Sequence, residues 1–268
     1  MRILPKRIKF PTISKRTKFV LNSIFLSAGF VGINFLPDEY RLGAIGALTL
    51  LTVLAFVWAL WEGLGKNATL FTLILPALFT LGVGLFWFLL PSTIFARLPV
   101  VMLYGLGIYA LGLTSNIYTV AAVRTIALMR AAKGVGFVLS LLVAFLIFDA
   151  ILSTRVNVLV NFLLIFIGSF LIFLQGVWVG RGKKEVAQEI LVKSLVFGLG
   201  IGEMGLLLYF WPVTVVVGSL FLTIGVYVLL GLGQADEEGR LFAQTIREYL
   251  FVGLIVFLAM FFATRWSG

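Results

Sequence analysis

The sequence contains no cysteine and no histidine in its 268 residues. Without cysteine it can form neither a disulfide nor a cysteine-ligated cluster, and without histidine it lacks the usual protein ligands of haem and zinc. The same two absences remove the Ser-His and Cys-His pairs of nucleophilic catalysis. We therefore expect no cofactor and no metal site in this chain.

Charged residues are also scarce. They make up 12% of the chain, against 61% hydrophobic residues, and the mean hydropathy is +1.13. A soluble domain is about half apolar and about a quarter charged, so one water-soluble core of this length could not hide so much apolar surface. The apolar runs are continuous and about 20 residues long, as in membrane-spanning helices, whereas barrel strands alternate apolar and polar residues. The sequence thus predicts an all-α, polytopic transmembrane helix bundle.

About nine apolar runs are long enough to span a bilayer. The seventh and eighth are separated only around Trp211 and Pro212, where proline favours a break or a kink. A kinked pair of half-helices across residues 191–232, and hence eight full crossings, is the alternative. The predicted spans are 19–36, 42–61, 69–90, 98–122, 134–153, 156–179, 191–211, 213–232 and 246–264.

The segments outside these spans are short. Residues 1–18 form a basic tail, residues 19–264 a single transmembrane helical domain, and residues 265–268 a short outer C-terminal tail. A cleaved signal peptide is the less favoured interpretation of the first run. The run 19–36 is long for the apolar part of a signal peptide, and no clear A-x-A cleavage site follows it.

The distribution of lysine and arginine predicts the orientation. With the N-terminus in the cytoplasm and alternating spans, 17 of the 21 Lys and Arg residues lie inside and four outside, as expected if positive charges resist translocation. The six tryptophans then fall near span ends, because indole rings favour the interface. We expect a multi-pass protein with a cytoplasmic N-terminus and an outer C-terminus, in the plasma (inner) membrane if the source is prokaryotic.

The net charge of +10 does not require a nucleic-acid partner. In the predicted topology the excess positive charge lies at the cytoplasmic membrane face, where anionic lipid is the ordinary counterpart. Besides the lipid bilayer itself, the partners expected are other membrane proteins or further copies of this chain.

Glu203 is the acidic residue that the sequence places deepest in the membrane. It precedes Trp211 by eight residues, which is about 12 Å along a helix and close to the middle of the hydrocarbon. An ionised carboxylate there should face the bundle interior, a partner or a wet cavity, or else be protonated. Asp149 lies nearer the outer end of its span and close to Arg155, which favours an interfacial role. The intramembrane amides that could donate to Glu203 are Asn116, Asn161 and Gln175.

Small and polar residues recur on one face of several predicted spans. Steps of four and seven residues keep them on one helical face. They line either a polar path or a packing seam, in which small residues let two helices approach; we favour the packing seam. On the seventh span, Gly198, Gly202 and Gly205 form such a pattern and are expected at a helix contact. The other stripes are Ser23, Ser27 and Asn34; Gly105, Tyr109, Gly112 and Asn116; and Asn157, Asn161, Gly168 and Gln175.

Acidic residues cluster once, at Asp236, Glu237 and Glu238. The charged stretch 234–247 is typical of a solvated helical connector rather than of a metal site. The basic run 181–184 lacks the spacing of a phosphate-binding loop and is expected to be a cytoplasmic anchor. A membrane enzyme acting on lipid-linked substrates, which would need clustered acids or a metal, is therefore the least favoured class. The best hypothesis is a small-solute or proton-coupled transporter, and the alternative is a non-catalytic scaffold or subunit of a membrane complex.

Overall fold

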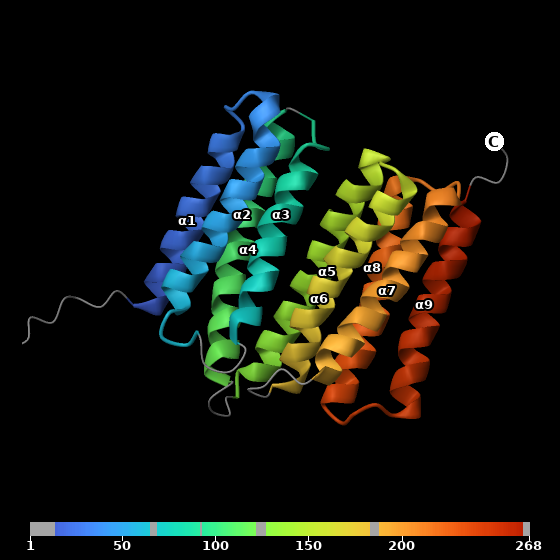
Figure 1. The fold of residues 1–268 in the computed structure, drawn as a ribbon. Coiled ribbons are helices and arrows are strands. Elements are labelled where there is room, and N and C mark those ends of the chain that lie inside the picture. The colour runs from blue at the N-terminus through green and yellow to red at the C-terminus, as the bar shows by residue number, and fades with distance from the viewer. Residues whose placement is uncertain (1–13, 65–68, 92, 122–126, 183–187, 265–268) are drawn as a thin grey trace, which may run out of the picture.

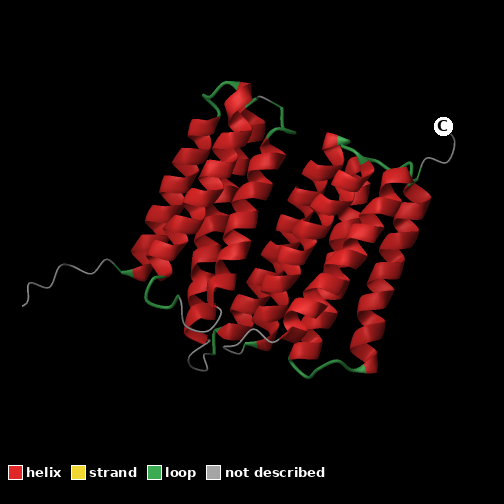
Figure 2. Cartoon of the chain, viewed as in Figure 1, coloured by secondary structure: helices red, strands yellow, loops and turns green. Residues whose placement is uncertain are grey.

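The computed structural model describes residues 14–64, 69–91, 93–121, 127–182 and 188–264. Within these ranges the chain is helical, and no strand is present (Figure 2). The helices in chain order are α1 (Lys15–Ile33), α2 (Asp38–Leu60), the 3₁₀ helix η1 (Thr69–Leu73), α3 (Ile74–Trp87), α4 (Ile94–Ala121), α5 (Met129–Thr154), α6 (Val158–Arg181), α7 (Gln188–Phe210), α8 (Val215–Glu237) and α9 (Ala243–Ala263).

The helices are long and apolar enough to make this a multi-pass membrane protein. Among the described residues, eight helices meet the length and hydropathy of a membrane span, from α2 to α9, with η1 and α3 forming one continuous span. The remaining helix, α1, has 19 residues and packs against α2 and α4. Its first turn is basic, so its apolar part begins at Phe19. The predicted all-helical, polytopic bundle is confirmed.

The chain reverses direction between α7 and α8. Only four residues separate the two helices, and the Thr214 side chain caps α8 by accepting a hydrogen bond from the Val217 amide at 3.4 Å. Lys193 near the start of α7 pairs with Asp236 near the end of α8. The alternative of one kinked span across residues 191–232 is therefore wrong, since α7 and α8 are two full antiparallel helices.

Two groups of helices stand side by side (Figure 1). Helices α1 to α4 form one group and α5 to α9 the other, and α5 joins them by packing against α3 and α4. The end of the bundle that holds the beginning of α1 and the α8–α9 turn is referred to below as the inner end, and the opposite end as the outer end. The sequence predicts that the inner end is cytoplasmic. The described tryptophans lie near helix ends, whereas Trp266 and the tails 1–13 and 265–268 lie outside the described residues.

The small and polar stripes of α1 and α4 pack against each other. Ser23 donates a hydrogen bond to the carbonyl of Gly105 at 2.5 Å, and a Cβ added at Gly105 would come within 2.8 Å of the Ser27 hydroxyl. About two turns further along α4, Gly112 lies directly against the Phe19 ring. These residues thus form a packing seam, in which the absence of a side chain lets the two backbones approach.

Candidate functional site

Glu203 points away from the interior of the bundle. Its side chain is exposed on the face of α7 that also carries the exposed residues Leu199 and Leu207. The other face of α7 carries the glycines that pack against α6. The face that carries Glu203 therefore points away from the bundle. Of the placements expected for this acid, the interior of this bundle is therefore excluded. A partner helix or a protonated carboxyl group at the lipid boundary remains.

The three amides lie apart from each other, and within the described residues none of them hydrogen-bonds to Glu203. Asn161 is close to the outer end of α6, and Gln175 follows it by 14 residues, or about 21 Å along the helix. Asn116 belongs to α4, in the other group of helices. The side-chain oxygen of each amide is buried without a hydrogen-bond partner. The structure does not assemble the predicted residues into one site.

Asp149 is buried within the membrane-spanning part of the bundle. Its residue exposure is 5%, and among the described residues it is the only Asp, Glu, Lys or Arg in the buried class. It accepts a hydrogen bond from the Ser219 hydroxyl of α8 at 3.2 Å and forms no ion pair within the described chain. Arg155, which the sequence places close to this acid, forms no ion pair with it; Arg155 takes a left-handed conformation (φ 47°) at the C-terminal end of α5.

A cavity of about 350 Å³ lies beside this buried acid, at the outer end of α5 to α8. Leu152 lines it one turn outward from Asp149, and Gly218, the neighbour of Ser219, also lines it and lies against Leu152. Asn161 also lines the cavity, 3% exposed and with its side-chain oxygen unpaired. Among the described residues that line it, Arg155 is the charged one, so the cavity offers a cation and an unpaired amide oxygen.

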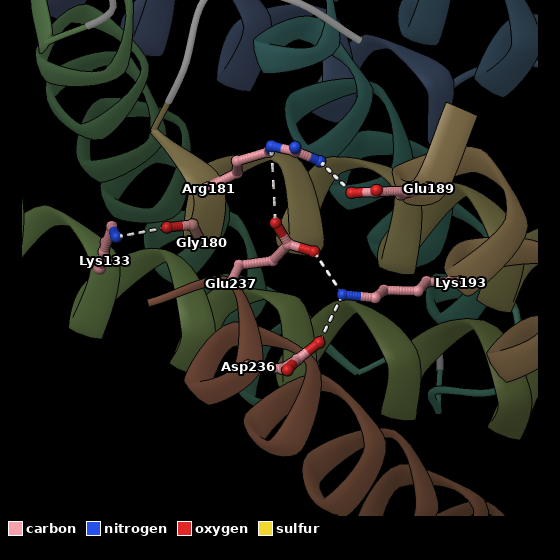
Figure 3. A network of polar contacts seen from close by, with 7 residues as sticks. All are labelled: Lys133, Gly180, Arg181, Glu189, Lys193, Asp236 and Glu237. Carbon is pink, nitrogen blue, oxygen red and sulfur yellow. Dashed lines mark hydrogen bonds and ion pairs between the residues drawn. The ribbon is translucent and has the colours of Figure 1, made fainter. Parts of the chain in front are cut away.

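The inner end of the same four helices holds a network of ion pairs (Figure 3). Glu237, whose side chain is 6% exposed, lies 2.6 Å from Lys193 and 3.7 Å from the Nε atom of Arg181. Lys193 also contacts Asp236 at 2.5 Å, and Arg181 contacts Glu189 at 3.0 Å. Buried charges need partners of opposite sign, and these pairs connect α6, α7 and α8.

A second branch of the network reaches α5. The ammonium group of Lys133 donates to the Gly180 carbonyl at 2.8 Å and to Glu238 at 2.7 Å. Glu238 also pairs with Arg240. The prediction of a solvated connector is wrong for Glu237 and Glu238, whose side chains are only 6% and 18% exposed.

The sequence patterns did not predict this network, because they assign the acids to a solvated connector and the bases to the cytoplasmic membrane face. The acidic triplet ends one span, and Lys133, Arg181 and Lys193 end three others at the same predicted face. Opposite charges at the same predicted membrane face are the sequence pattern that indicates such a network. The acids pair with these bases, and within the described residues no group of three acids converges to hold a metal ion.

The three glycines of α7 lie against α6. An added Cβ would meet the Phe170 backbone nitrogen at 3.0 Å from Gly198, a Phe162 ring atom at 3.0 Å from Gly202, and the Ile165 side chain at 2.5 Å from Gly205. The glycines therefore leave room for the backbone and side chains of α6, and the two helices approach closely along this face.

Comparisons with known proteins identify the family and leave the activity open. A search of curated proteins and a search of solved structures each found no match. A family profile matches residues 21–263, which include part or all of every helix described above. The chain belongs to the family described as a protein of unknown function (DUF5656).

Proposed function

We propose that this protein is a proton-coupled carrier of a small anion, in which Asp149 takes up and releases the proton. The observation that carries the proposal is the burial of this one carboxyl group between α5 and α8, with a single hydroxyl partner. An unpaired charge is costly in an apolar interior. A proton that binds the carboxylate removes that cost, which gives proton binding a direct effect on the packing of α5 against α8.

The outer cavity supports a small solute as the cargo. Its volume of about 350 Å³ lies within the range of small-molecule sites. Arg155 offers hydrogen bonds to an anion, and the unpaired side-chain oxygen of Asn161 can accept one from a hydroxyl or amino group of the same solute. The polar face of α8 continues inward from Ser219 to Thr223, whose hydroxyl bonds to the Ser219 carbonyl at 2.7 Å. Asp149 does not line the cavity, so its effect on a solute there passes through Leu152 and Gly218, the lining residues next to the acid and to its partner Ser219.

The test uses proteoliposomes that contain a pH-sensitive dye. Small organic and inorganic anions are added outside one at a time, and proton entry that depends on the anion is recorded. We expect Asp149→Asn to abolish this flux. Glu203→Gln is the matched control, because it removes an acid from the lipid-facing side of α7 and should leave the flux unchanged. Absence of coupled flux with every anion, or equal flux through Asp149→Asn, contradicts the proposal.

A second candidate, a subunit of a larger membrane complex, is favoured by Glu203 itself. An acid exposed near the middle of a spanning helix is costly against lipid, and a partner helix would supply its missing hydrogen bond. Isolation in mild detergent tests this candidate. A co-purifying membrane protein that is lost with Glu203→Leu but retained with Leu199→Ala, a neighbour on the same exposed face, would support it.

A further inference from the structure

A second cavity, of about 480 Å³, lies at the inner end where α5, α8 and α9 meet. Its charged lining residues are Arg130 and Lys133 of α5, Glu238 at the end of α8, and Arg240 in the turn before α9. Nothing in the proposed transport function uses this cavity, because the buried acid and the outer cavity lie at the other end of the same helices. The binding chemistry of this cavity is therefore independent of the transport proposal.

The charges that line this cavity do not balance. Glu238 is the only acid among three cations, and it already pairs with Lys133 and Arg240. Arg130 is exposed and forms no ion pair or hydrogen bond within the described residues. The cavity thus carries an uncompensated guanidinium group, which favours the binding of an anion with oxygen acceptors.

The beginning of α9 adds to this preference. α9 starts at Ala243, and Phe242 before it offers no side-chain cap to the first-turn amides. Uncapped amides and the helix dipole make the N-terminus of a helix favourable to phosphate and carboxylate groups. Phe242 and Arg240 both line the cavity, so the helix N-terminus and the guanidinium groups lie at the same place.

The position of the cavity favours a lipid over a soluble anion. It lies level with the first turn of α5 and the last turn of α8, where lipid headgroups meet the ends of spanning helices. Phe137 and Tyr249 supply apolar walls. α9 has Met260 as its one buried residue, so the rest of the bundle leaves most of this helix uncovered. Gly134 lines the cavity and faces open space, because no atom lies within 4 Å of an added Cβ.

We propose that this cavity binds the phosphate group of an anionic phospholipid from the inner leaflet, with Arg130 as the principal cation. The test is native mass spectrometry of the detergent-solubilised full chain, with phosphatidylglycerol and phosphatidylcholine of identical acyl chains. We expect preferential retention of phosphatidylglycerol and a loss of about tenfold in its affinity in Arg130→Gln, because one charge-assisted contact is removed.

Two further variants make the test specific. Arg247→Gln removes an exposed arginine of α9 that does not line the cavity, and should retain the lipid preference. Gly134→Leu places a side chain in the open space, where an added Cβ meets no atom within 4 Å, and should weaken retention while leaving the charges intact. Equal retention of both lipids by the unchanged protein, or equal losses in Arg130→Gln and Arg247→Gln, overturns the proposal. So does thermal stabilisation by inorganic phosphate that depends on Arg130 without any lipid preference, since that result assigns the site to soluble phosphate.

Discussion

The Nζ atom of Lys193 lies 2.6 Å from the Oε1 atom of Glu237, and this ion pair joins the start of α7 to the end of α8. Glu237 is nearly enclosed, with 6% of its side chain exposed, whereas Lys193 keeps 30%. One turn further into the bundle, Gly233 lies against the Phe197 ring. The ion pair therefore holds α8 at one register along α7, and the glycine contact continues that register into the apolar interior.

Removing this carboxylate should destabilise the inner end. We expect Glu237→Gln to lower the free energy of unfolding by about 2 kcal/mol, because Lys193 and Arg181 lose a shared charged acceptor. Asp236→Asn is the control: that side chain is 44% exposed, and its loss should cost less than about 1 kcal/mol. Unfolding in micelles by added sodium dodecyl sulfate measures both. Equal effects of the two substitutions would show that burial of Glu237 does not govern the strength of the pair.

The close approach of α6 and α7 should not tolerate a large side chain at Gly202. A Cβ there would lie 3.0 Å from the Phe162 ring and 3.2 Å from the Phe166 Cβ, so Gly202→Leu should lower stability by about 1–3 kcal/mol through overpacking. At Gly200, two residues away on the same helix, an added Cβ meets no atom within 4 Å, so Gly200→Leu should be nearly neutral. Thermal unfolding in detergent distinguishes them, and an unchanged Gly202→Leu would place that face of α7 toward lipid.

Replacing Glu203 by an apolar residue should stabilise the monomer. Glu203→Leu removes a carboxyl group from the exposed face of α7, which we expect to meet hydrocarbon in the isolated monomer. Acids near the centre of a spanning helix are costly there, so we expect a gain of up to about 2 kcal/mol in bicelles. A less stable monomer would mean that the carboxyl group forms a contact inside the bundle.

The two ends of the chain should lie on opposite sides of the membrane. The described helices alternate in direction from α1 to α9, and the lysine and arginine distribution places the N-terminus inside. Reporter fusions at the two termini should therefore show a cytoplasmic N-terminus and an external C-terminus. Activity of both reporters on one side would require that one of the nine helices does not cross.

The sequence alone was sufficient for the membrane architecture. The predicted boundaries agree with the helices to within a few residues, from the first span at Phe19 to the last near Thr264. In lipid, the backbone N–H and C=O groups of an apolar run of about 20 residues can all form hydrogen bonds only in a helix. The break at Trp211 and Pro212 was visible as well, although the pattern did not show whether the chain bends or reverses there.

The orientation of each polar side chain was decided only by the tertiary structure. Sequence depth ranked Glu203 first and Asp149 second, yet Glu203 faces outward and Asp149 is enclosed against Ser219. Hydropathy reports how deep a residue lies, but not which side of its helix meets a neighbour. In lipid the outer surface is as apolar as the interior, so the amphipathic pattern that reveals the buried face of a soluble helix is weak. Packing of particular shapes, such as Gly205 against Ile165, sets the rotation of α7 and with it the direction of Glu203.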